Sequence, residues 1–146
     1  MSTPDNILSV EELKTNFYTP HGVAKAVNNF TFHLKKQENL GLVGESGCGK
    51  SVTALSIMRL IKDPPGRIID GRVWFNETDL LKLPLNEMKT VRGNQISMIF
   101  QEPMTSLNPL FSIGDQIAEM LIVHRKLSHK ESWSMAVEIL EKVQIP

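Results

Sequence analysis

The chain has 146 residues, of which 41% are hydrophobic and 22% are charged, as in an ordinary globular domain. This composition excludes a disordered polyelectrolyte, a collagen-like repeat and a membrane-embedded channel. Lys and Arg together number 16, as do Asp and Glu, so the zero net charge gives no support for bulk electrostatic binding of nucleic acid. The single cysteine, Cys48, rules out an intrachain disulfide and favours a reducing compartment.

No segment approaches the roughly 20 apolar residues that a helix needs to cross a bilayer. The first residues lack the basic and apolar regions of a secretory signal. We therefore expect no direct membrane span, and any membrane association through a partner protein.

The first forty residues favour antiparallel strands. Residues 7–10 are mostly aliphatic, residues 19–22 carry turn chemistry, and apolar side chains mostly alternate between residues 27 and 34. We expect an antiparallel β piece over roughly residues 7–36.

The middle of the chain alternates short apolar runs with helical patterns. The apolar runs predict buried strands at residues 40–43 and 96–100, and residues 71–75 predict a further strand after a glycine turn. The helical patterns predict helices at residues 49–61 and 86–91, the first with a broad apolar face and an end at the turn 63–66, the second with an end at Gly93.

The remainder of the chain predicts two helices, each with an N-terminal cap. Ser112 precedes apolar residues spaced i, i+4, i+7 and i+8, and Asp115 takes the place of the usual capping-box glutamate. Ser128 and Glu131 fit the S-x-x-E capping box in front of the second apolar pattern.

A glycine-rich octapeptide lies between the predicted strand at 40–43 and the helix that follows. It matches G-x-x-x-x-G-K-S/T, the Walker A phosphate-binding loop, with the residues Gly44, Glu45, Ser46, Gly47, Cys48, Gly49, Lys50 and Ser51. The glycines let backbone N–H groups converge on phosphate oxygens, and the helix directs its positive end at the same place. Lys50 supplies a charge for the β- and γ-phosphates, and the Ser51 hydroxyl is a suitable ligand for Mg²⁺. We expect these eight residues to bind ATP, with Cys48 in a variable position and without a redox role.

A second candidate follows the predicted strand at 96–100. Gln101 stands at the end of this strand and opens a loop interrupted by prolines. Its amide oxygen can ligate Mg²⁺, and the side chain can orient the attacking water. Taken alone, Gln101 is more simply an ordinary strand-end glutamine, and its spacing from Lys50 is what favours a role in the site.

Together these segments resemble the N-terminal part of an ATP-binding subunit of an ABC transporter, and more narrowly the oligopeptide and dipeptide importer subgroup. The resemblance is carried by residues 25–27, 40–51, 92–93 and 99–109. Many NTPases share the Walker A motif, whereas the Met-Thr-Ser-Leu-Asn-Pro segment that ends at residue 109 is more specific to peptide importers.

The resemblance implies roles for individual residues. Gln101 would sense the γ-phosphate, join Ser51 at the Mg²⁺ ion and couple to the membrane subunits. Phe17 is the best match for the aromatic residue that stacks on adenine, Tyr18 is an alternative, and a core strand position for Phe17 is equally open. The implied partners are transmembrane permease subunits and a second ATP-binding subunit, at the cytoplasmic face of the cell membrane.

Three family elements do not occur in the 146 residues: a Leu-Ser-Gly-Gly-Gln signature, a Walker B strand with its Asp and catalytic Glu, and a switch histidine. Residues 67–71 imitate a Walker B strand, but they have only two apolar residues and Gly71 in the place of the glutamate. We therefore expect residues 1–146 to be the N-terminal portion of one ABC ATP-binding domain, truncated before the signature.

The expected fold class is α/β: a P-loop NTPase core of ABC ATPase type with the antiparallel β piece and the start of a helical subdomain after residue 112. The expected function is that of an ATP-binding subunit that powers import of peptides or related solutes, although this chain alone is expected to be inactive. Two alternatives remain: a nucleotide-binding fragment without hydrolysis, and a P-loop enzyme of another class such as a kinase or GTPase. The Gln-Glu-Pro segment at 101–103 argues against the second.

Overall fold

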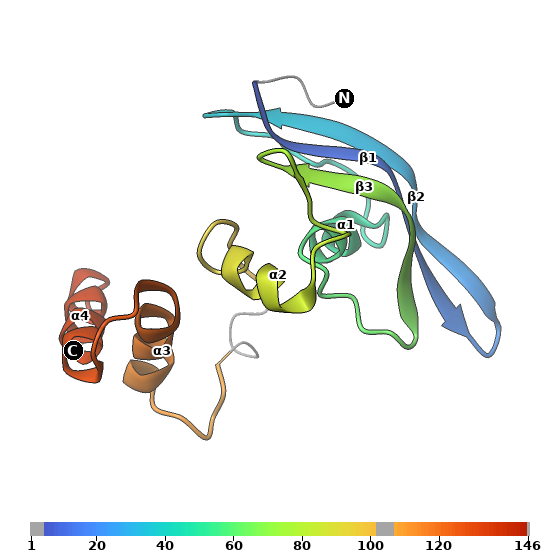
Figure 1. Cartoon of the computed structure of the whole chain (residues 1–146). Helices are drawn as coiled ribbons and strands as arrows, with labels where there is room; N and C mark the ends of the chain where they lie inside the picture. The colour runs from blue at the N-terminus through green and yellow to red at the C-terminus, as the bar shows by residue number, and fades with distance from the viewer. Residues whose placement is uncertain (1–4, 102–106, 146) are drawn as a thin grey trace. The chain divides into compact units, whose positions relative to one another are not determined.

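The structure is a computed structural model that describes residues 5–101 and 107–145 (Figure 1). The chain divides into two compact units, residues 1–88 and 89–146, and each is described by itself. The first unit contains a four-stranded sheet and the helix α1. The second contains the helices α3 and α4, and α2 (Leu85–Val91) crosses the boundary between the units.

The sheet has the strand order β2-β1-β3-β4, and every pair in it is antiparallel. As predicted for residues 7–36, β1 (Asn6–Thr19) and β2 (Gly22–Lys35) form a long hairpin (Figure 1). The strand predicted at 71–75 is part of β3 (Gly66–Phe75), which begins earlier because β1 offers hydrogen-bonding partners along its whole length. The short β4 (Thr78–Asp79) pairs with the end of β3.

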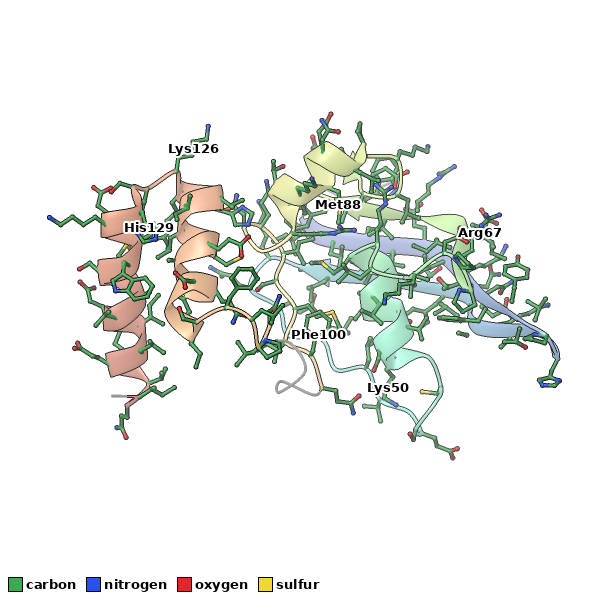
Figure 2. The ribbon with its side chains drawn as sticks, turned by 90° about the horizontal axis from the view of Figure 1, so that it is seen from below. Lys50, Arg67, Met88, Phe100, Lys126 and His129 are labelled. Carbon is green, nitrogen blue, oxygen red and sulfur yellow. The ribbon has the colours of Figure 1, made fainter. Side chains whose placement is uncertain are left out.

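The helix α1 (Lys50–Ile57) packs against β1 and β2, with Lys50 at its beginning (Figure 2). It ends four residues before the predicted Ile61. Arg59 adopts a left-handed φ of 52°, and the N–H of Leu60 donates to the carbonyl of Leu55 at 2.8 Å. This is the hydrogen-bonding pattern of a Schellman motif, which closes a helix even where the apolar pattern continues.

The apolar core of the first unit lies between the sheet and α1. Its buried apolar side chains come from three strands, from the end of the helix and from the segment after β4: Val10, Leu13, Val27, Ile57, Met58, Val73, Phe75 and Leu80. The side of α1 that is buried carries Thr53, Ser56 and Ile57, so the broad apolar face predicted for this helix is wrong in part.

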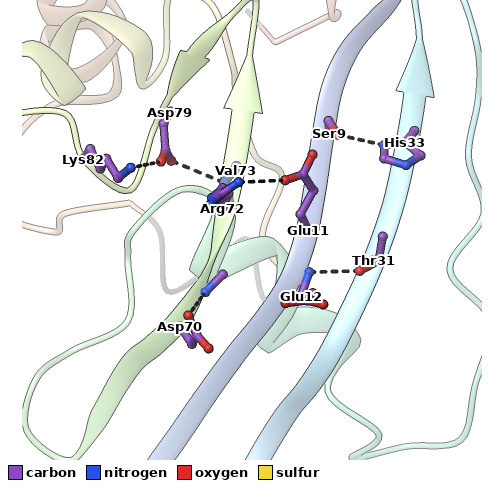
Figure 3. Close-up of polar contacts among 11 residues, drawn as sticks. Ser9, Glu11, Glu12, Thr31, His33, Asp70, Arg72, Val73, Asp79 and Lys82 are labelled. Atoms are coloured by element: carbon purple, nitrogen blue, oxygen red, sulfur yellow. Dashed lines mark hydrogen bonds and ion pairs between the residues drawn. The ribbon is translucent and has the colours of Figure 1, made fainter. Parts of the chain in front are cut away.

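Polar contacts connect the neighbouring strands (Figure 3). The Ser9 hydroxyl and the Nδ1 atom of His33 share a hydrogen bond of 2.7 Å between β1 and β2. Between β1 and β3, the Lys14 ammonium donates to the Asp70 carboxylate at 2.9 Å, and this hydrogen bond holds the pKa of Asp70 below its ordinary value. The contacts link all three long strands.

Two predicted strands are not formed. Residues 40–43 and 96–100 belong to no strand, and within the described ranges their only ladder contact is an isolated bridge between Arg92 and Ile96. Val43 is 98% exposed and Ile99 is 95% exposed. A buried strand requires neighbours that satisfy its backbone and cover its side chains. The part of the chain that the structure describes supplies no such neighbours to either segment.

The second unit is built around α3 (Ile113–Arg125) and α4 (His129–Lys142), which pack against each other. Both predicted caps are present. The Ser112 hydroxyl accepts the N–H of Asp115 at 3.1 Å, and Ser128 and Glu131 form a complete capping box. Among the described residues, no helix is long and apolar enough to cross a membrane.

The predicted helix at 86–91 corresponds to α2 within one residue. Gly93 follows it with a φ of +79°, as expected for the residue that ends this helix. In the second unit a β-carbon on Gly93 would lie 2.6 Å from Cε of Met120, so the turn after α2 sits directly on α3.

Candidate phosphate-binding site

The loop that precedes α1 has a backbone shape that favours glycine at two positions. Gly47 and Gly49 have φ values of +83° and +93°, in the left-handed region that side chains disfavour. A β-carbon on Gly49 would also collide with the carbonyl oxygen of Ala26 on β2. The loop therefore lies against β2 so closely that its last glycine cannot carry a side chain.

Lys50 folds back over this loop. Its ammonium group donates to the carbonyl oxygens of Gly44 at 2.7 Å and Glu45 at 2.6 Å, and lies 3.4 Å from the sulfur of Cys48. The positive charge is thus held inside the curve of the loop. An anion that enters the loop meets this charge at once.

The first turn of α1 offers free backbone donors beside the same charge. The earliest helical hydrogen bond runs from the N–H of Thr53 to the carbonyl of Gly49 at 2.8 Å, so the N–H groups of residues 50–52 have no acceptor within the helix. No side chain caps this end, and its first turn carries no acidic residue. An uncapped helix start with a lysine beside it suits the oxygens of a phosphate group.

Ser51 is exposed at the start of α1. The loop residues Glu45, Ser46, Gly47 and Cys48 are exposed as well. Most of the octapeptide thus lies at the surface, where a ligand can reach it without a rearrangement of the core.

A cavity of about 230 Å³ adjoins the loop on the side of β2. Its walls include Ala26, Val27, Phe30, Val43, Cys48 and Lys50. Apolar residues of β2 and the charged Lys50 line the same cavity, so a ligand there would meet both kinds of surface.

Phe17 does not line that cavity. It pairs with Gly66 across β1 and β3, and its ring and the side chain of Ile61 flank the α-carbon of Gly66. The ring is half-buried beside the segment that follows α1, whereas Tyr18 is 50% exposed and its N–H donates to the carbonyl of Pro65 at 2.8 Å. Stacking of either ring on adenine stays a prediction.

Gln101 is exposed and lies in the second unit, whereas Ser51 lies in the first. Their joint binding of Mg²⁺ therefore stays a prediction. The residues after Gln101 in the importer-like segment, 102–106, lie outside the described residues. Among those described, no three His, Cys, Asp or Glu side chains gather as a metal site by themselves.

The imitation of a Walker B strand at residues 67–71 is part of β3. Asp70 in it is bound by Lys14 and also accepts the N–H of Gly71 at 2.9 Å. Its carboxylate thus takes part in an ion pair between β1 and β3.

Two polar contacts of α1 were missed by sequence reasoning. The Thr53 hydroxyl donates to the carbonyl of Gly49 at 3.0 Å, and the Ser56 hydroxyl is hydrogen-bonded to Thr15 on β1 at 2.8 Å. The available signal was the pair of hydroxyl residues three positions apart in a helix, which places them on one face.

A family model and individual known proteins both relate this chain to ABC transporters. The family model described as ABC transporter matches residues 27–146. The chain is 49% identical over 140 residues to an oligopeptide transport ATP-binding protein of Bacillus subtilis, a match that covers 96% of this chain and 39% of that protein. It is 45% identical over 142 residues to an oligopeptide transport ATP-binding protein of Escherichia coli, covering 97% of this chain and 42% of that protein.

The fold is also similar to that of a solved structure, a bacterial ABC transporter cassette determined as a dimer. The TM-score is 0.77 at 23% sequence identity, and the match covers 92% of this chain and 56% of the cassette. The chain spans about two fifths of the length of the curated relatives that it matches.

Proposed function

Since this chain belongs to the ABC transporter family, we propose that residues 44–51 bind the phosphates of ATP and that the chain is part of an ATP-binding subunit. The observation that carries the proposal is the convergence of three features on one loop. These are the left-handed glycines Gly47 and Gly49, the ammonium of Lys50 and the uncapped start of α1. Each supplies positive charge or free N–H donors at the same place.

The loop fits a triphosphate by its chemistry. Lys50 would exchange the carbonyl oxygens of Gly44 and Glu45 for phosphate oxygens, which carry more negative charge. The N–H groups of the first turn of α1 would bind the same oxygens. Mg²⁺ would be bound by the Ser51 hydroxyl, by the Gln101 amide oxygen and by the phosphates, a set of hard oxygen ligands.

The descriptions of similar proteins support the further proposal that the subunit powers import of peptides or related solutes. Two of the similar proteins are described as oligopeptide transport ATP-binding proteins. We infer that the partners are permease subunits of the membrane and a second ATP-binding subunit, and that the complex lies at the cytoplasmic face of the cell membrane. Gln101 would link the nucleotide to the permease.

Calorimetric titration of the 146-residue chain with Mg-ATP tests the nucleotide site. Replacing Lys50 with Ala removes a charge-assisted hydrogen bond to phosphate, for which we expect an affinity loss of about 10- to 150-fold. Lys36→Ala, in the exposed connection after β2, is the matched control and should bind as the unaltered chain does. Equal affinities for all three proteins would overturn the proposal.

A further inference from the structure

We propose that Thr15 and Ser56 are positioning residues for the phosphate loop, because their hydrogen bond fixes α1 to β1 and thereby aims the start of the helix at the ligand. The inference rests on the proposed function, since it concerns how tightly the same loop binds nucleotide.

The contact is fully buried and has one arrangement of protons. Thr15 and Ser56 are both 0% exposed, and their hydroxyl oxygens lie 2.8 Å apart. The Ser56 hydroxyl donates its single proton to the carbonyl of Val52 at 2.7 Å. Thr15 is therefore the donor to Ser56, and both hydroxyls have a partner without water.

A second buried hydroxyl forms a hydrogen bond at the other end of the same helix. Thr53 is 4% exposed and donates to the carbonyl of Gly49, the glycine that lies against Ala26 of β2. Gly49 therefore lies close against β2, while the Ser56 hydroxyl connects the other end of α1 to β1. Because α1 is short and rigid, with a rise of about 1.5 Å per residue, a rotation or slide at Ser56 moves the N–H groups of residues 50–52 by a similar amount.

The hydroxyl groups of Thr15 and Ser56 constrain the orientation of α1 on β1 as well as the distance between the helix and the strand. An apolar side chain in place of Ser56 would bury more carbon surface but would accept several orientations of the helix. A buried hydroxyl is stabilising only while its hydrogen bond is kept, and that bond weakens steeply when the angle is poor. The pair therefore favours one orientation of α1, the one in which its free N–H groups and Lys50 meet at the loop.

The test compares variants of the 146-residue chain for Mg-ATP affinity and for thermal stability. Thr15→Val keeps the shape of the side chain, removes the donor and leaves the bond from Ser56 to Val52 intact. We expect it to weaken binding by about 3- to 10-fold at a temperature at which the variant is fully folded. Thr15→Ser keeps the hydroxyl and should restore most of the affinity.

Thr31→Val is the matched control for a β-sheet threonine, since the Thr31 hydroxyl accepts the N–H of Glu12 at 2.9 Å on an exposed part of the sheet. It should bind nucleotide as the unaltered chain does. Loss of stability alone does not weaken binding while nearly all molecules are folded. An affinity loss in Thr15→Val, absent in Thr31→Val and reversed in Thr15→Ser, would therefore support positioning.

Ser56→Ala gives a second route if Thr15→Val does not fold, with Ser132→Ala, another fully buried helical serine, as its control. Wild-type affinity in the folded Thr15→Val or Ser56→Ala variant, with Lys50→Ala still impaired, would overturn this inference and leave the proposed function standing. If the unaltered chain binds no better than Lys50→Ala, the proposed function fails and the inference fails with it.

Discussion

The ammonium of Lys50 donates to the carbonyl oxygen of Gly44 at 2.7 Å, so the last charged residue of the loop is hydrogen-bonded to its first glycine. The lysine also bonds to Glu45, which closes the loop upon itself. Ligand binding at this loop is consequently an exchange of acceptors, in which phosphate oxygens replace backbone carbonyls. The lysine side chain thus bonds to the carbonyl groups of the loop, and the N–H groups of the first turn of α1 stay available for a ligand.

Gly49→Ala should destabilise the first unit. The change places a β-carbon at a φ of +93° and against the carbonyl oxygen of Ala26, and left-handed backbone of this kind costs about 1–3 kcal/mol. Gly41→Ala is the control, because nothing lies within 4 Å of the β-carbon that it would add. Denaturant unfolding measures both variants, and a Gly49→Ala variant as stable as Gly41→Ala would contradict the close approach of the loop to β2.

The start of α4 should loosen in acid. Hydrogen bonds from the hydroxyl and the backbone N–H of Ser128 lower the pKa of Glu131 below its ordinary value. The charged carboxylate therefore stabilises the helix fully above the ordinary glutamate pKa of about 4.3, and this contribution is lost as the pH falls through the lower pKa of the folded chain. Amide exchange of residues 129–131 against pH measures the effect.

Glu131→Gln serves as the comparison for that measurement, since glutamine can also complete a capping box but does not titrate. Its amide exchange in the first turn of α4 should lack the acid transition attributed to Glu131. Glu138→Gln, on the same helix outside the cap, should keep the transition. Identical pH profiles for all three proteins would show that Glu131 does not stabilise the helix start.

Gln101 should lie near Ser51 when the chain binds Mg²⁺ and nucleotide. Both oxygens would then coordinate one ion at about 2.0–2.1 Å. Gln101→Ala should reduce the dependence of ATP affinity on Mg²⁺, whereas Gln95→Ala, another exposed glutamine of the second unit, should leave it unchanged. A crystal structure with Mg-nucleotide that places Ser51 and Gln101 on opposite faces would make Gln101 an ordinary surface residue.

The 146-residue chain should not turn over ATP above background. Phosphoryl transfer requires a positioned water, a fixed metal and stabilised charge, and no carboxylate of this sequence occupies a Walker B position. Loss of a general base alone lowers the rate by about 10²- to 10⁴-fold. Phosphate release with and without Mg²⁺ measures this, and turnover that Lys50→Ala abolishes would contradict the expectation that the chain lacks the groups needed for hydrolysis.

The features that depend on neighbours in sequence were predicted well. The loop at residues 44–51, the hairpin of β1 and β2 and the caps at Ser112 and Ser128 are all present. Each is set by residues within a few positions of one another: a glycine that permits a left-handed φ, a turn between alternating runs, or a hydroxyl three residues before the N–H that it accepts. Such local preferences can be predicted from a single sequence.

The features that depend on distant parts of the chain were decided only by the tertiary structure. Residues 40–43 and 96–100 have the composition of buried strands, yet they are not strands, because a strand exists only through pairing and the described chain offers them no partner. The apolar pattern of α1 likewise did not reveal that Ser56 faces Thr15, which is 41 residues away. Composition determines which segments can pack, whereas the partner across space determines which of them do.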